Sequence, residues 1–135
     1  MHLKCEEVEQ ITVFLENRPG VVSDLCNHLT ERHISIRALT VLDTIDIGTM
    51  RLVVNDAQLA KEALTAAGAA YVCVRCVAVE IPNKPGGFAS VARTMALAGV
   101  NIEYVYASAM PGVEKTMGIF RVSDVQRALT LAYEG

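Results

Sequence analysis

The sequence predicts an α+β protein built from two copies of one unit, each with an antiparallel sheet and helices on one face of that sheet. Three observations predict it. A short turn sequence occurs twice, similar strand and helix patterns surround both copies, and an aspartate precedes an alanine-rich stretch late in each copy. These patterns indicate a duplication, with the first repeat over residues 1–75 and the second over residues 76–135.

The repeated turn is ENRPGVVSDL, which returns as PNKPGGFASV. Asn17 is matched by Asn83, so the offset is 83 − 17 = 66 positions. Proline fixes its own φ and disfavours helical backbone in the residue before it, whereas glycine accepts φ of either sign. Each turn therefore favours a strand that ends cleanly and a helix that begins at once.

The segments beside both turns match in period. Residues 11–16 and 77–81 alternate between apolar and other side chains, which predicts strands. After the turn, three apolar residues stand at helical spacing in each copy: Val22, Leu25 and Leu29, then Phe88, Val91 and Met95. Extended segments follow in each copy, namely HISIRALTVLD and MRLVV, then GVNIEYVYASA and GIFRV.

The second helix of each copy begins at an aspartate. Asp56 and Asp124 are natural N-caps, because a short carboxylate accepts from unpaired backbone N–H groups. Alanine-rich helices follow over DAQLAKEALTAAG and DVQRALTLAYEG. A further strand, residues 70–75, completes β-α-β-β-α-β in the first repeat, a ferredoxin-like arrangement with a four-stranded antiparallel sheet. The second repeat lacks this last strand.

The missing strand leaves an unpaired edge. We expect residues 70–75 to pair with 11–16, which exposes the edge of the strand 77–81. Open apolar edges are usually covered. Residues 3–9 precede the first strand as 77–81 follow the fourth, so LKCEEVE can replace the absent strand and one sheet would then span both copies. Pairing with another subunit is the alternative.

Composition narrows the class of protein. Twelve Lys+Arg against fifteen Asp+Glu give a net charge of −3, which favours neither nucleic acid nor anionic membranes as partners. No apolar run is long enough to span a membrane, and the charged start MHLKCEEVEQ does not resemble a signal peptide, so we expect a cytoplasmic protein with reduced cysteines.

A hydrophobic content of 52% predicts apolar surface that another subunit covers. Simple alternation places Leu39, Val41, Val105 and Ala107 on the sheet face opposite the helices. We therefore expect a homodimer, since twofold pairing is the commonest closed assembly.

Catalytic and cofactor patterns are weak. No Ser/His/Asp or Cys/His group recurs at matched positions, and no glycine-rich loop fits a nucleotide phosphate, so we expect neither an enzyme nor a cofactor. Cys73 and Cys76 have metal-motif spacing but fall within a strand, where residues three apart point to opposite faces. Tyr104 and Tyr106 favour sheet packing or a dimer contact over base stacking, given the net negative charge.

The repeated turn is the candidate binding site. A turn that opens into a helix presents unpaired N–H groups and the positive end of the helix dipole, where a carboxylate can bind. Gly20, Gly86 and Gly87 leave the backbone bare, and Arg18 and Lys84 add positive charge. On the residues alone, a ligand site and a plain connection remain equally open.

The segments NRPGVVSDLCNHLTERHISI and NKPGGFASVARTMALAGVNI resemble the ACT domain family, ferredoxin-like modules that sense amino acids. The resemblance covers nearly the whole chain, twice. It implies a ligand held between paired domains and touching the first turn, the helix start and the Asn-Ile step. Those positions are Asn17, Arg18, Pro19, Gly20, Val21 and Val22, then Asn83, Lys84, Pro85, Gly86, Gly87 and Phe88, and finally Asn101 and Ile102.

Two departures make the sites unequal. Asparagine opens both turns where the family usually has an acidic residue that would pair with a ligand's ammonium. The first copy also has His33 to Ile36 where the second has the Gly-Val-Asn-Ile pattern. We expect the second site to bind better, because Gly86 and Gly87 leave more backbone bare and only this copy has Asn101.

The resemblance thus implies a free-standing regulatory protein that binds an amino acid or related carboxylate and acts on a partner enzyme or on its own assembly. One alternative is a structural, oligomerisation or regulatory subunit of an amino-acid metabolic enzyme with vestigial sites. Another is an enzyme that acts on small carboxylates.

Overall fold

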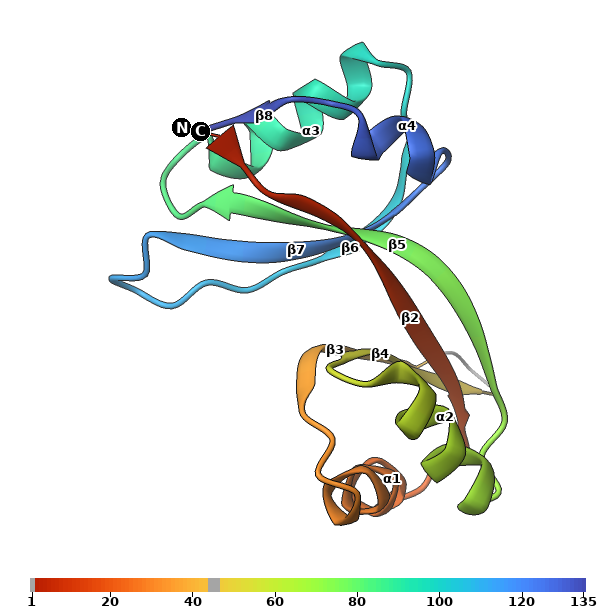
Figure 1. Ribbon diagram of the computed structural model, residues 1–135. Coiled ribbons are helices and arrows are strands. Elements are labelled where there is room, and N and C mark those ends of the chain that lie inside the picture. Colours follow the sequence, from red (N-terminus) through yellow and green to blue (C-terminus); the bar gives the residue numbers. More distant parts are fainter. Residues whose placement is uncertain (1, 44–46) are drawn as a thin grey trace. The chain divides into compact units, whose positions relative to one another are not determined.

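The computed structural model of the chain describes residues 2–43 and 47–135 (Figure 1). The chain divides into two compact units, Glu9–Val74 and Met1–Val8 with Arg75–Gly135. We call them the first-repeat unit and the second-repeat unit. The predicted boundary after residue 75 lies next to the point where the chain re-enters the second-repeat unit. The first eight residues, however, group with the second repeat.

The first-repeat unit has a four-stranded sheet with both helices on one face (Figure 1). Its strand order is β3-β4-β2-β5, and the pairs that β4 forms with β2 and β3 are antiparallel. Two of its strands, β2 and β5, continue into the other unit. The elements are β2 (Cys5–Leu15), α1 (Val21–Glu31), β3 (Ile36–Asp43), β4 (Gly48–Val54), α2 (Ala57–Ala66) and β5 (Tyr71–Pro82).

The second-repeat unit repeats this order as β6-β7-β5-β2, with helices again on one face (Figure 1). It uses the second half of β5 and the first half of β2. A two-stranded ladder joins the start and the end of the described chain. The remaining elements are α3 (Gly87–Leu97), β6 (Ile102–Tyr106), β7 (Lys115–Val122), α4 (Val125–Leu129), β1 (His2–Leu3) and β8 (Tyr133–Glu134).

The N-terminal segment does replace the missing fourth strand. In the second-repeat unit, the Glu80 N–H donates to the Lys4 carbonyl at 2.9 Å. In the first-repeat unit, the Phe14 N–H donates to the Ala70 carbonyl at 3.0 Å, as the predicted pairing of 11–16 with 70–75 requires. The strands form one hydrogen-bonded order, β3-β4-β2-β5-β7-β6, because β2 and β5 contribute to both units. This prediction is confirmed.

The prediction for the face opposite the helices is wrong. Leu39 pairs with Leu52 and Val41 with Met50, and both partners lie in the core under the helices. A bulge between Ile36 and Ala38 adds one residue to β3 and reverses the alternation beyond it.

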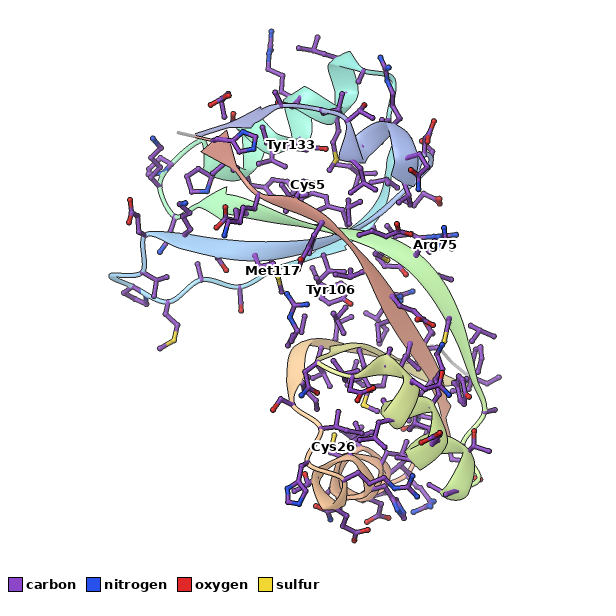
Figure 2. All side chains as sticks on the ribbon, viewed as in Figure 1. Cys5, Cys26, Arg75, Tyr106, Met117 and Tyr133 are labelled. Carbon is purple, nitrogen blue, oxygen red and sulfur yellow. The ribbon has the colours of Figure 1, made fainter. Side chains whose placement is uncertain are left out.

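A bulge between Ile102 and Tyr104 does the same in β6, so Val105 pairs with core residue Phe120, and Ala107 follows the end of the strand. Tyr106 instead pairs with Ile119 and, like Met117, points away from α3 and α4 (Figure 2).

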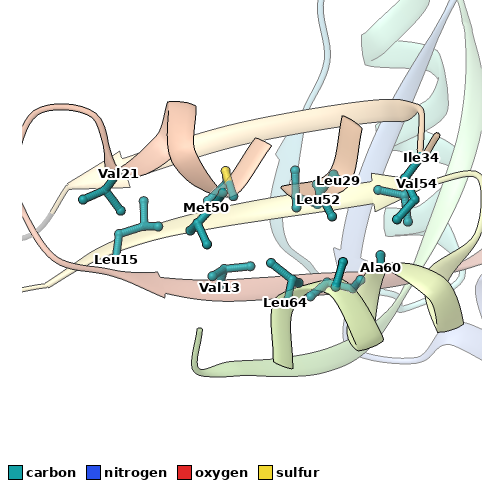
Figure 3. Close-up of a cluster of buried hydrophobic side chains, with 13 residues drawn as sticks. Val13, Leu15, Val21, Leu29, Ile34, Met50, Leu52, Val54, Ala60 and Leu64 are labelled. Atoms are coloured by element: carbon teal, nitrogen blue, oxygen red, sulfur yellow. The ribbon is translucent and has the colours of Figure 1, made fainter. Parts of the chain in front are cut away.

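Helices and strands of the first-repeat unit meet in one apolar cluster (Figure 3). Alternate residues of β2 and β4 supply one side of the cluster, and α1 supplies Leu25 and Leu29 at the predicted helical spacing. The predicted caps also form, because the carboxylates of Asp56 and Asp124 accept from backbone N–H groups in the first turns of α2 and α4, each at 3.0 Å. No helix of the described residues is long and apolar enough to cross a membrane.

The end of the chain differs from the prediction. The expected helix over residues 124–135 stops at Leu129, and the segment beyond it runs beside α3 as β8 (Figure 1). Tyr133 is fully buried, and its hydroxyl donates to the Ala128 carbonyl at 2.9 Å. Leu3, paired with Tyr133 across β1 and β8, is also buried. Residues 133–134 are extended because they pair with β1, and this pairing replaces the last turns of the expected helix.

Cys5 and Tyr133 make the stability of this region sensitive to alkaline pH. Burial raises the pKa of the Cys5 thiol from 9.0 to about 11, and burial also raises the pKa of Tyr133. Above pH 9 the unfolded chain releases the thiol proton while the folded chain keeps it, so the free energy of unfolding falls as pH rises toward 11. We predict that Cys5→Ala reduces this fall, measured by urea unfolding at pH 8 and pH 10. Equal losses in the wild type and the variant would contradict the assignment.

Candidate functional site

The two predicted turns have the same backbone geometry. The Arg18 N–H donates to the Glu16 carbonyl at 3.0 Å, and the Lys84 N–H donates to the Pro82 carbonyl at 2.9 Å. The glycine before each helix has left-handed backbone, with φ of 88° at Gly20 and 84° at Gly86. The duplicated sequence therefore specifies a duplicated turn, because only glycine adopts this conformation at little cost.

Both turns leave a helix N-terminus without a side-chain cap. The cap residues of α1 and α3 are Gly20 and Gly86, and neither helix start has a side-chain cap hydrogen bond. The helices α2 and α4 differ, since an aspartate caps each of them. Helix starts without caps retain backbone donors and the positive end of the dipole, both of which suit a carboxylate. The contrast within one chain marks α1 and α3 as the helices that can receive an anion.

Glycine is required at position 87 for packing. A Cβ at this position would lie 2.0 Å from the carbonyl oxygen of Pro82, so the start of α3 packs directly on the end of β5. Its N–H donates to the Lys84 carbonyl at 3.0 Å. Gly86, in contrast, is exposed and has no atom within 4 Å of an added Cβ. Of the two glycines, Gly86 is the one that leaves the approach to the backbone open.

Asn83 holds the neighbouring hairpin. Its side-chain amide donates to the carbonyls of Met110 at 3.0 Å and Val113 at 2.7 Å, and its backbone N–H donates to Glu114 at 2.9 Å. The amide nitrogen is thus engaged, and its oxygen is the group that can accept from a ligand. The sequence does not predict these hydrogen bonds of Asn83, because their acceptors lie about thirty residues further along the chain, in the loop between β6 and β7.

The structure does not bring Asn101 near the second turn. Asn101 follows the far end of α3, a helix of 11 residues that is about 16 Å long. Its backbone exchanges hydrogen bonds with Ser123, and Ile102 packs against the core at the start of β6. One amino-acid ligand cannot touch both Gly86 and Asn101 of the same unit. A single ligand could contact both a turn and an Asn-Ile step only if these came from two different copies of the fold.

The first turn adjoins a small cleft of about 140 Å³. It brings together the predicted residues Asn17, Arg18, Val21 and Val22. The cleft also includes Val41 and Leu42 of β3, both exposed by more than 40%, which sequence analysis did not assign to a site. No local signal identifies these two residues, because the β3–β4 hairpin reaches the turn only through the folded sheet.

The charges near the two turns differ. The Arg18 guanidinium pairs with the Glu16 carboxylate at 3.1 Å, and both side chains are exposed. In the second repeat Pro82 takes the position of Glu16, since 82 − 16 = 66, so Lys84 has no matching acid there. Phe88, at the start of α3, is 44% exposed and stacks on Phe120 with ring centroids 5.9 Å apart. The second turn therefore lacks the ion pair of the first and has an aromatic side chain at the start of its helix.

The sequence model of the ACT domain pair family matches residues 6–133 of this chain. The chain belongs to the ACT domain pair family. Among solved structures, protein BT0572 from Bacteroides thetaiotaomicron is similar, with 28% identity, a TM-score of 0.85, and coverage of 93% of this chain and 85% of that one. A search of curated proteins found no matching relative.

Two further similar structures are regulatory subunits of aspartate kinase. The ligand-free Thermus thermophilus subunit has 21% identity and a TM-score of 0.71. The Thermus flavus subunit has 20% identity and a TM-score of 0.67. In both cases the match covers 96% of this chain and 93% of the other. At these identities the likeness establishes the fold alone, which agrees with the predicted pair of ferredoxin-like repeats.

The glycines make a graded test of the turn geometry. We predict that Gly20→Ala and Gly86→Ala each cost about 1–2 kcal/mol of unfolding free energy, because both glycines have positive φ in open space. Gly87→Ala should cost more, since its Cβ would overlap the Pro82 carbonyl. Urea unfolding followed by circular dichroism measures all three. Gly87→Ala with wild-type stability would contradict the close packing of α3 on β5.

Proposed function

We propose that this ACT domain pair is a non-catalytic regulatory protein that binds an amino acid or a related small carboxylate. The observation that carries the proposal is the contrast between capped and uncapped helices. Glycines with positive φ end the repeated turns, and α1 and α3 begin there without a side-chain cap, whereas α2 and α4 are capped by aspartate. A ligand carboxylate supplies the missing acceptor.

The proposed roles follow from the groups that each turn leaves available. In the second repeat, the N–H groups of Phe88 and Ala89 are the proposed donors, because the Gly87 N–H already bonds the Lys84 carbonyl. Lys84 adds positive charge for the carboxylate. The side-chain oxygen of Asn83 accepts from the ligand's ammonium, in place of the acidic residue that is usual in the family.

The regulated partner is proposed to be an enzyme of amino-acid metabolism. The similar Thermus structures are described as regulatory subunits of aspartate kinase, one of them in a ligand-free form. A fold shared with such subunits suits a protein that transmits ligand binding to a partner. If thermal-shift screening against the twenty amino acids detects no ligand, the structural or oligomerisation role replaces the sensing role.

The second turn is the first to test. We predict that Gly86→Val abolishes binding of the amino acid found by screening, because a branched side chain blocks the uncapped N-terminus of α3. Gly20→Val should weaken binding less. Gly68→Val is the matched control, since Gly68 also has positive φ and open space but follows α2. Calorimetry measures affinity and circular dichroism checks folding. A folded Gly86→Val protein with undiminished affinity would show that the turn only connects.

Self-association is proposed through β3. This strand ends the sheet order and presents Leu39 and Val41, which are 42% and 44% exposed. Apolar edge strands are usually covered by another chain. We predict a dimer mass by light scattering at micromolar concentration and a monomer for Val41→Lys. Leu97→Lys, at an apolar position of α3 that is 76% exposed, should remain dimeric. A monomer mass for the wild type would refute the proposal.

A further inference from the structure

A second, larger cleft lies on the other side of α1 in the first-repeat unit. Its volume is about 440 Å³. Asp24 and His28 of α1 line one wall, and the connection Ala67–Ala70 between α2 and β5 lines the other. Glu16 and Arg18 lie at the end of β2 and in the turn beyond it. Arg18 and Val21 of the first turn also line this cleft, whereas the contacts proposed at the second turn do not involve it.

Equivalent backbone hydrogen bonds show which residues of the two repeats correspond to one another around this cleft. The bond from Phe14 to Ala70 in the first repeat corresponds to the bond from Glu80 to Lys4 in the second, with 80 − 14 = 66. Ala69 therefore corresponds to Leu3. On the helix, Asp24 corresponds to Ser90, because 90 − 24 is also 66. The walls of the cleft are thus equivalent to β1 and to the first turns of α3.

In the second-repeat unit this equivalent place is filled by the chain itself. The strand β8 pairs with β1, with Tyr133 opposite Leu3. The Ser90 hydroxyl donates to the carbonyl of Glu134 at 3.2 Å. Gly135 lies so close to Pro82, which corresponds to Glu16, that an added Cβ would come within 2.7 Å of the proline ring. The segment 133–135, which contains β8, runs beside α3 (Figure 1). The equivalent place in the first-repeat unit is the cleft.

Two differences from the filled place determine which segment the cleft can accept. Asp24 replaces Ser90, so a carboxylate that only accepts stands where a hydroxyl donates. Tyr71 corresponds to Cys5, since 71 − 5 = 66, and its hydroxyl lies 3.3 Å from that of Thr65. The Tyr71 ring packs against the core of this repeat, whereas Tyr133 fills the core of the other. A segment in this cleft therefore needs donor groups and small side chains rather than a buried aromatic ring.

We propose that the cleft between α1 and residues 67–70 binds a short extended segment of a partner protein, with small side chains and a positively charged or N–H group facing Asp24. The segment takes the position that residues 133–135 take in the second-repeat unit. Extended segments commonly bind by adding to existing strands, and about 440 Å³ lies within the range of ligand pockets. This site is separate from the amino-acid site at the second turn.

The test uses peptides derived from the segment that fills the equivalent place. The first probe is acetyl-Leu-Ala-Ala-Lys-Gly-amide, in which alanine replaces the tyrosine and lysine replaces the glutamate of residues 131–135. The second probe keeps glutamate in place of lysine. We expect the lysine peptide, titrated into the ¹⁵N-labelled full chain, to cause saturating NMR shifts at residues 24–28 and 67–70. The glutamate peptide should bind more weakly, because the Asp24 carboxylate repels it, whereas Glu16 is already paired with Arg18.

Matched variants locate the contact. Asp24→Lys should weaken binding of the lysine peptide about tenfold or more, which corresponds to the loss of one charge-assisted hydrogen bond. Ser23→Lys places the same charge in the same turn of α1 but does not line the cleft, and it should bind as the wild type does. Gly86→Val should also bind the peptide normally, which separates this proposal from the amino-acid site.

Three results would overturn the proposal. The first is the absence of saturating shifts at millimolar peptide, and the second is equal binding by wild type and Asp24→Lys. The third is the same set of shifts produced by free lysine or free alanine, which would make the cleft a site for single amino acids rather than for a protein segment.

Discussion

The unpaired edge of β5 is the constraint on which the second repeat depends. Among the described residues, no strand after α4 pairs with β5. Exposed backbone donors and acceptors along an apolar strand favour aggregation. The N-terminal half of β2 pairs there, as the bond from Glu80 to Lys4 shows. This pairing brings Leu3 into the second core, and Leu3 in turn gives Tyr133 a strand to pair with. The start and the end of the described chain therefore stabilise each other.

The two repeats show how one inherited turn acquires different surroundings. Gly20 and Gly86 have the same left-handed backbone, which an L side chain adopts only with strain. The next position differs, because Val21 packs into the core of its repeat whereas Gly87 must lack a side chain to pack on Pro82. The turn geometry is thus common to both copies, but access to each helix start depends on neighbouring strands.

Because the chain is an internal duplication, each position in one repeat can be compared with its equivalent in the other. A place that is filled in one repeat and open in the other identifies a binding surface without any bound ligand. Ser90 and Asp24 occupy equivalent positions, yet the first holds the chain's own backbone and the second lines a cleft. Asn83 combines two roles, because its amide nitrogen holds a hairpin loop through two hydrogen bonds while its side-chain oxygen is the proposed acceptor for the ligand.

The sequence by itself determined the features that depend on local backbone preference and on periodicity. These include the two turns, the caps at Asp56 and Asp124, the order of strands and helices, and the strand that replaces the missing one. Tertiary structure decided the rest. The bulges before Ala38 and Tyr104 arise from strand pairing and cannot be read from alternation in one strand. The bonds of Asn83, the need for Gly87 and the burial of Tyr133 depend on groups that only the folded chain brings within reach.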